Sequence, residues 1–129
     1  MEVTYSCSKN IAAGQLQNLF TSINWDSGKY PEKLSRAIYG HSFVYTAWDC
    51  DRLIGLISVM DDNELNANIT YLLVHPKYQK KGIGSELISF IKKKYKNYLN
   101  VSLISYSKSV SFYNTFGFKN DRNAIALLL

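Results

Sequence analysis

The 129-residue sequence predicts one α/β domain in which a mostly antiparallel sheet contains a single parallel pair of strands. Three apolar and β-branched runs, 43–48, 53–60 and 66–74, are separated by short polar turns, which is the pattern of an antiparallel meander. An amphipathic stretch at about 84–96 then precedes another strand-like run at 101–105. Because a helix between two strands makes a crossover connection, the strands before and after it are expected to run parallel.

The outer segments complete this domain. Apolar residues at helical spacing, from Leu16 to Ile23, predict a first helix, and Pro31 and Gly40 suit the start and end of a second. The other expected elements are a strand at 3–5, an exposed polar loop at 24–30, a short helix near 109–116 and a terminal strand at 124–129.

Composition places the chain among ordinary globular proteins. Hydrophobic residues make up 47% and charged residues 19%, which argues against disorder. Because the sequence has no apolar run of about 18 residues and no basic-then-apolar leader, we expect no membrane association and a cytoplasmic location. The net charge of +5 favours anionic ligands.

Few residues suit a metal ion or a nucleic acid. Cys7 and Cys50 stand alone in the sequence and are expected to be free thiols in or near the core. His41 and His75 are too sparse for a metal site, so no metal is expected. The lysines of 92–96 are typical of a solvated helix face, and no known nucleic-acid-binding motif accompanies them, so nucleic-acid binding is only a weaker alternative.

The segment from Val74 to Gly84 has the build of a phosphate cradle. It connects a strand directly to a helix through a basic turn that contains two glycines. Unpaired backbone N–H groups and the positive end of the helix dipole converge on an anion at such a turn. The spacing Gln79-x-x-Gly82-x-Gly84 is shorter than that of a P-loop and lacks the third glycine of a dinucleotide fingerprint, so neither nucleotide motif fits.

This spacing resembles the acetyl-coenzyme A loop of the GNAT superfamily of N-acetyltransferases. The later stretch 109–118, with Phe112-Tyr113 followed by Gly117-Phe118, resembles a second motif of the same superfamily. The resemblance implies a single GNAT domain over residues 1–129, with helices on both faces of the sheet and a parallel strand pair that splays apart to hold the pantetheine arm. It also implies acetyl-CoA, that is acetyl-coenzyme A, as cosubstrate.

The resemblance assigns most of the cofactor contacts to the strand end and the loop. Backbone N–H groups around Leu73 and Val74 would bind the thioester carbonyl oxygen, and the N–H groups from Gln79 to Gly84 would bind pyrophosphate. The cofactor-binding residues implied in full are Leu72, Leu73, Val74, Gln79, Lys80, Lys81, Gly82, Ile83, Gly84, Ser85, Ser109 and Phe112.

Tyr113 is the candidate catalytic acid, since it holds the tyrosine position of the superfamily's Phe-Tyr pair. A phenol can protonate a departing thiolate of similar acidity. The alternative is that Tyr113 only packs beside Phe112 and Phe116.

The general base and the acceptor site stay open. Strand 66–74 carries no carboxylate where many relatives have a glutamate, which leaves His75, an acidic side chain acting through water, or an amine that arrives neutral. Tyr106 stands where relatives often have an asparagine that contacts pantetheine. The acidic candidates are Asp26, Asp61, Asp62 and Glu64, and the candidate substrate-binding residues are Trp25, Tyr30 and Asn66.

Together these features predict an acetyl-CoA-dependent N-acetyltransferase. It would move an acetyl group to a primary amine of a small molecule by direct attack in a ternary complex. The missing strand carboxylate keeps an alternative open, a noncatalytic acyl-CoA-binding regulatory module. The resemblance also makes a homodimer an expectation.

Overall fold

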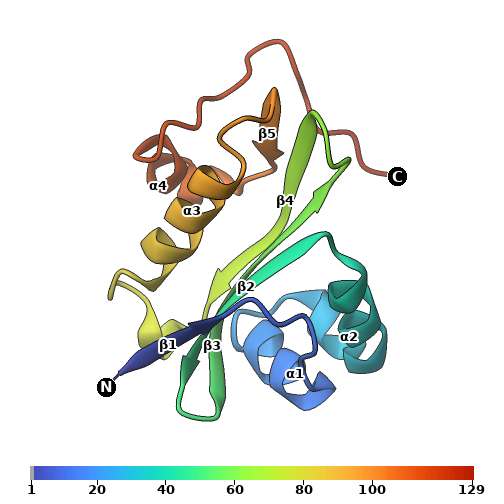
Figure 1. The fold of residues 1–129 in the computed structure, drawn as a ribbon, viewed down its shortest axis with the longest axis vertical. Coiled ribbons are helices and arrows are strands. Elements are labelled where there is room, and N and C mark those ends of the chain that lie inside the picture. The colour runs from blue at the N-terminus through green and yellow to red at the C-terminus, as the bar shows by residue number, and fades with distance from the viewer. Residues whose placement is uncertain (1) are drawn as a thin grey trace.

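The computed structural model describes residues 2–129 and shows a central sheet with helices on both faces (Figure 1). Its strands are β1 (Val3–Ser6), β2 (Phe43–Asp49), β3 (Arg52–Asp61), β4 (Asn66–Val74) and β5 (Asn100–Leu103). Its helices are α1 (Ala13–Ser22), α2 (Pro31–Gly40), α3 (Ile83–Lys94) and α4 (Val110–Asn114), with short 3₁₀ turns η1 (Asp26–Lys29), η2 (Pro76–Tyr78) and η3 (Ser107–Ser109).

The strands lie in the order β1-β2-β3-β4-β5. The first four pair antiparallel, and β4 and β5 run parallel because α3 carries the chain back across the sheet between them. The predicted fold class is therefore confirmed.

β4 and β5 are paired over only part of their length. Their register starts at Asn66 and Asn100 and ends at Ile69 and Leu103. Beyond Ile69, β4 continues to Val74 and stays paired with β3 on its other side. One edge of β4 is thus open after Ile69, over residues 70–74, in agreement with the expected splay.

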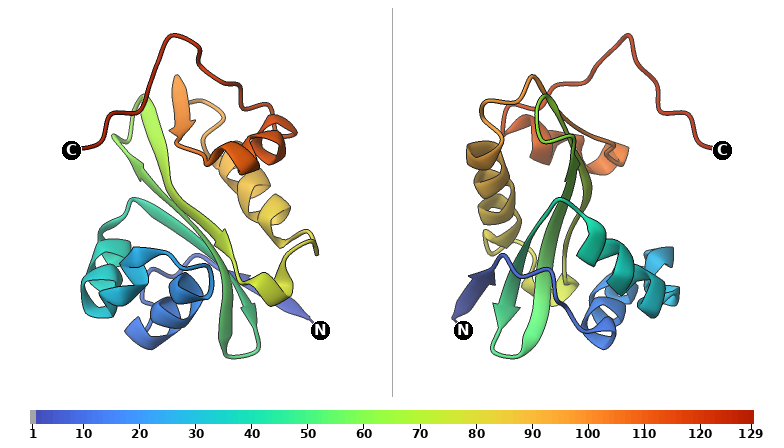
Figure 2. Two further views of the ribbon diagram at one scale, coloured as in Figure 1. Left: turned by 180° about the vertical axis from the view of Figure 1, so that it is seen from behind. Right: turned by 45° about the vertical axis from the view of Figure 1, so that its right-hand side comes forward.

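The two faces of the sheet carry different helices (Figure 2). α1 and α2 turn an apolar stripe that includes Leu16, Phe20 and Ile38 toward one face, where it packs with Leu56 and Leu73 of the sheet. The segment 24–30, expected as an exposed loop, instead contains η1, and its Gly28 is buried against α1.

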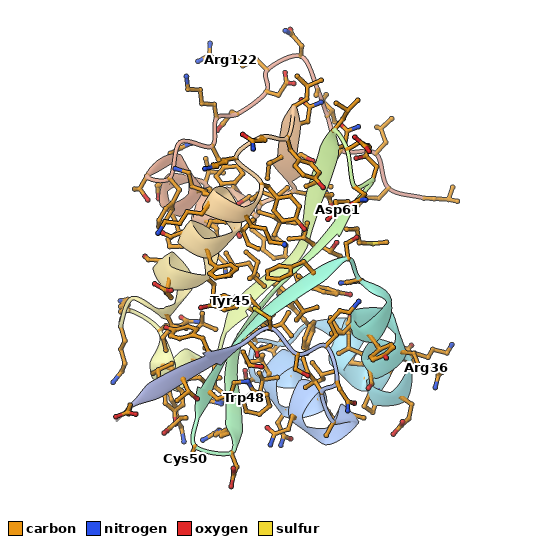
Figure 3. The ribbon with its side chains drawn as sticks, viewed as in Figure 1. Arg36, Tyr45, Trp48, Cys50, Asp61 and Arg122 are labelled. Atoms are coloured by element: carbon orange, nitrogen blue, oxygen red, sulfur yellow. The ribbon has the colours of Figure 1, made fainter. Side chains whose placement is uncertain are left out.

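α3 covers the opposite face through Ile83, Leu87, Ile88 and Ile91, all of which are buried. Parallel aromatic rings extend this core: Tyr45 lies between the sheet and α3 in Figure 3, with its ring centroid 4.1 Å from that of Phe90 and 5.4 Å from that of Tyr5. At its far end, the Tyr95 hydroxyl donates to Asp61 across 2.6 Å, which ties the chain after α3 to the end of β3. These contacts fix the direction in which α3 leaves the loop.

The expectation that Cys7 and Cys50 lie in or near the core is wrong. Both are free and exposed, and Cys50 lies at the tip of the β2–β3 turn in Figure 3. Its φ of 51° belongs to the left-handed region that such tight turns require. The turn geometry, and not the apolar character of the thiol, decides where Cys50 lies.

The expected terminal strand at 124–129 is also wrong. This segment pairs with none of the five described strands, and Ile125, Leu127 and Leu128 are 85–90% exposed. An apolar run has the composition of a strand, but it becomes one only where a partner edge and a packing surface are available. Among residues 2–129, no helix has the length and apolar character needed to cross a membrane.

His41 is a buried polar residue between α2 and β2. It is 6% exposed, and its Nδ1 atom has no hydrogen-bond partner within residues 2–129. Burial, and then the charge of Lys9, hold the pKa of His41 below its ordinary value of 6.5. The unfolded chain therefore binds a proton more readily than the folded chain does.

We predict that this difference makes the fold less stable in mild acid. As the pH falls below about 6.5, the unfolded state takes up the His41 proton first, so the free energy of unfolding decreases. His41→Leu should lose less stability than the wild type between pH 7 and pH 5 in urea titrations. His75→Gln should also reduce the loss of stability in acid, because the pKa of His75 is lowered in the same direction. An unchanged pH slope in His41→Leu would contradict the prediction.

Candidate active site

A cavity of about 570 Å³ opens beside the unpaired part of β4. Its walls are the end of β4, the turn before α3, and the segment that leads from Tyr106 into α4. Segments far apart in sequence therefore converge here. The predicted site residues that line the cavity are Trp25, Leu72, Leu73, Val74, Gln79, Lys80, Gly82, Ile83, Gly84, Ser85, Ser109, Phe112 and Tyr113.

Three predicted residues lie outside the cavity lining. Lys81 is exposed on the loop. Tyr30 is 59% exposed beyond η1, with the Lys33 amine 5.9 Å from its ring centre. Asn66 lies at the opposite end of β4, where its side-chain amide donates to Asp62 across 2.9 Å, and it lines a separate polar pocket of about 290 Å³. Asn66 therefore lies apart from the cavity, because the length of β4 separates it from the loop.

The turn between β4 and α3 points several backbone N–H groups in one direction. Lys80 has a φ of 63° and Gly82 a φ of 85°, and both values belong to the left-handed region. The side-chain amide of Gln79 donates to the carbonyl oxygen of Val74 across 2.9 Å and braces the turn against its own strand. Tyr78 anchors the other side through a 2.6 Å hydrogen bond to Asp49.

These N–H groups are free to bind an anion. Within residues 2–129, the amides of residues 80–85 donate to no protein acceptor. The N–H groups in the first turn of a helix have no carbonyl partner within that helix. Before α3, the left-handed residues Lys80 and Gly82 alternate with others, which leaves further N–H groups of the turn exposed. With the Lys80 ammonium and the positive end of the α3 dipole, the loop fits a pyrophosphate group.

The open edge of β4 presents a second set of donors. The N–H of His75 donates to Ile54 of β3 across 2.8 Å. Because backbone groups alternate sides along a strand, those of Leu73 also face β3, while those of Leu72 and Val74 face the gap that β5 leaves. Of the two N–H groups expected to bind the thioester carbonyl oxygen, that of Val74 faces the gap and that of Leu73 faces β3, and the N–H of Leu72 is the second one that faces the gap.

α4 closes the cavity from the side of β5. A methyl group at Gly84 would lie 3.5 Å from the Phe112 ring, so α4 packs directly over the start of α3. Tyr113 contacts the Phe112 ring edge to face, with centroids 5.3 Å apart, and it also lines the cavity. Burial raises the pKa of the Tyr113 phenol, so the hydroxyl carries its proton at neutral pH. Tyr113 therefore both packs and presents a proton donor.

A family model described as an acetyltransferase (GNAT) domain matches residues 17–126 of this sequence. The chain belongs to the GNAT family of acetyltransferases. GNAT acetyltransferases in general use acetyl-CoA as cosubstrate. The free amides of the loop fit its pyrophosphate, and the open edge of β4 fits its pantetheine arm.

Known proteins similar to this GNAT chain cover nearly its whole length. The uncharacterized N-acetyltransferase ycf52 of Porphyra purpurea is 27% identical, over 96% of this chain and 74% of its own. The GCN5-related N-acetyltransferase 2, chloroplastic, of Arabidopsis thaliana is also 27% identical, over 96% of this chain and 56% of its own. A GNAT-family acetyltransferase structure from Streptococcus pneumoniae superposes with a TM-score of 0.86 at 25% identity, covering 99% of this chain and 97% of that one.

The GNAT motifs did not identify the far wall of the cavity. Ile23, Trp25 and Tyr106 form it, and the rings of Trp25 and Tyr106 lie 6.5 Å apart. Phe20 and Tyr71 hold the Trp25 indole from behind, each with its centroid 6.0 Å away. Tyr78 and Lys108 also line the cavity, and no local sequence signal singled out Ile23 or Lys108 as site residues.

None of the side chains considered for the general base of this GNAT chain lines the cavity. His75 Nδ1 accepts from the N–H of Lys77 across 3.1 Å, and Nε2 lies 3.0 Å from the Arg52 guanidinium. Asp26 forms a 3.1 Å ion pair with Lys29. The remaining candidates, Asp61, Asp62 and Glu64, lie around the β3–β4 turn at the other end of the sheet.

We predict that the loop of this GNAT chain depends on a glycine at position 82. A methyl group there meets no atom within 4 Å, so Gly82→Ala should act through backbone strain at φ 85°. It should cost about 1 kcal/mol of stability and weaken acetyl-CoA binding, because an L-residue disfavours this φ. Thermal unfolding with and without acetyl-CoA measures both effects.

Gly14→Ala is the matched control. A methyl group at Gly14 also meets nothing within 4 Å, but the residue lies in α1 at an ordinary helical φ. Alanine should therefore preserve or raise stability there. Equal behaviour of the two variants would contradict a strained role for Gly82.

Proposed function

We propose that the single GNAT domain of residues 1–129 transfers the acetyl group of acetyl-CoA to a primary amine of a small molecule, by direct attack within a ternary complex. The observation that carries the proposal is one cavity that joins a phosphate-binding loop, two open backbone donors and a half-buried phenol. Bound acetyl-CoA would supply the activated acetyl group and the thiolate leaving group.

The chain's own groups would act in sequence along the cavity. The amides of residues 80–85 and the Lys80 ammonium hold the pyrophosphate. The N–H of Leu72 or Val74 donates to the thioester oxygen, where negative charge grows as the amine attacks. A fixed donor at such a position contributes about 3 kcal/mol to transition-state stabilisation in comparable sites.

Tyr113 would complete the reaction as the acid. As the C–N bond forms and the C–S bond breaks, the attacking nitrogen gives up one proton to water, the departing thiolate takes the phenolic proton, and Tyr113 regains a proton from water. The raised pKa of Tyr113 makes the phenol a weaker acid but keeps it protonated over the working pH range. Ser109 and Tyr106 lie on the same wall and could contact the pantetheine arm.

We predict that Tyr113→Phe lowers kcat by about 10²-fold or more while the KM for acetyl-CoA changes little, because the ring packing is kept and only the proton is lost. The measurement is release of free thiol from acetyl-CoA with a panel of amines. Tyr98→Phe is the control, since it removes a phenol that packs on Tyr95 away from the cavity. A near-normal kcat in Tyr113→Phe would contradict the acid role.

The same assay separates catalysis from simple binding. A noncatalytic acyl-CoA-binding module is the second candidate, because no imidazole or carboxylate among residues 2–129 lines the cavity. Thermal stabilisation by acetyl-CoA without thiol release for any amine would favour the module. Thiol release with one class of amine would establish the transferase.

A further inference from the structure

The charge on the cavity wall is of one sign. Among residues 2–129, the charged side chains that line the cavity are Lys80 and Lys108. Lys80 belongs to the amide loop, where it faces the proposed phosphate site. Lys108 lies in η3, in the segment between β5 and α4, and is separate from that loop. The cavity therefore presents a second cation that the phosphate site does not account for.

Lys108 lines the same cavity as two aromatic side chains, Trp25 and Tyr106. Its neighbour Tyr106 is 63% exposed and lies 6.5 Å from Trp25, ring centre to ring centre. The nearest acid in sequence to Trp25 is Asp26, which pairs with Lys29 and does not line the cavity. An acceptor that lies on Trp25 and Tyr106 is thus within reach of a lysine and of no carboxylate on that wall.

This charge pattern discriminates between acceptors. A second cation on the acceptor is repelled by Lys108, while an anionic group is attracted and can accept its hydrogen bonds. The aromatic faces of Trp25 and Tyr106 suit the apolar part of the same molecule. The wall is therefore complementary to an acceptor that combines an apolar group with a negative charge.

The amine itself must lose a proton before it can attack. At pH 7.5, about a third of N-terminal α-amino groups are neutral, against about one in a thousand lysine-type amines, from their ordinary pKa values near 7.7–8.0 and 10.4. A cavity lined by two lysines disfavours an ammonium ion further. Such a cavity works best with an amine of low intrinsic pKa.

We propose that the acceptor is a small, acidic α-amino compound, such as a short peptide with an apolar first residue and a carboxylate after it, and that Lys108 selects it by pairing with the carboxylate. The proposal rests on the acetyl transfer proposed above and names the class of its acceptor. In this arrangement the neutral α-amine points toward Leu72 and Val74, and the apolar side chain covers Trp25 and Tyr106.

The test compares three dipeptides with the same α-amine, Tyr-Glu, Tyr-Gln and Tyr-Arg, each prepared as its C-terminal amide so that only the second side chain changes the charge. With the wild-type chain we expect kcat/KM to fall in that order, by about tenfold from first to last, since an attraction is exchanged for a repulsion. Lys108→Gln should bring the three values to within about threefold, and Lys108→Glu should reverse the order, while the KM for acetyl-CoA stays the same.

Lys80→Gln is the matched control on the other wall. It should raise the KM for acetyl-CoA and leave the order of the dipeptides intact. The inference is overturned if Tyr-Arg is the best acceptor, or if Lys108→Gln changes only the KM for acetyl-CoA. Absence of thiol release with every dipeptide and every simple amine would instead overturn the proposed transferase, and the acceptor assignment with it.

Discussion

The site depends on the divergence of two parallel strands. β5 follows β4 only as far as Ile69, so the last residues of β4 keep one row of backbone groups without a partner. In a protein interior such groups cost free energy unless something binds them. Here the gap opens into a cavity, and the turn, α4 and Trp25 are all arranged around it. The pairing of β4 with β3 continues to Val74, with one register shift between Ser58 and Val59, while the other edge of β4 stays open.

Much of this arrangement could be predicted from local sequence. The meander and the crossover follow from short-range patterns, and the loop follows from the spacing of Gln79, Gly82 and Gly84. Each of these patterns reflects a local preference of the backbone for one conformation, and the packing in the structure agrees with that preference. The positive φ of Gly82 explains a glycine at that position, whereas a methyl group at Gly84 would lie 3.5 Å from the Phe112 ring, an ordinary contact distance.

The rest could not be predicted, because it depends on contacts between distant segments. Trp25 and Lys108 line the same cavity only because the chain around η1 and the chain around η3 fold against it from distant parts of the sequence. Asn66 belongs to the same strand as Leu72 and Val74, but it lies at the other end of β4, beside the separate polar pocket. The apolar tail after Ala124 has strand composition and no partner. In each case the residue types could be interpreted from the sequence, but the places of these residues in the fold could not.

The hydrogen bond from the Gln79 side chain to the Val74 carbonyl leaves the open edge of β4 with more free donors than free acceptors at this end. Leu72 and Val74 would otherwise offer both donors and acceptors to the gap. The Gln79 amide occupies the carbonyl of Val74 and leaves its N–H free. With the amides of the turn added, this end of the gap presents an excess of donors. A chain of carbonyl and phosphoryl oxygens matches that surface, whereas a ligand rich in N–H groups would leave donors facing donors.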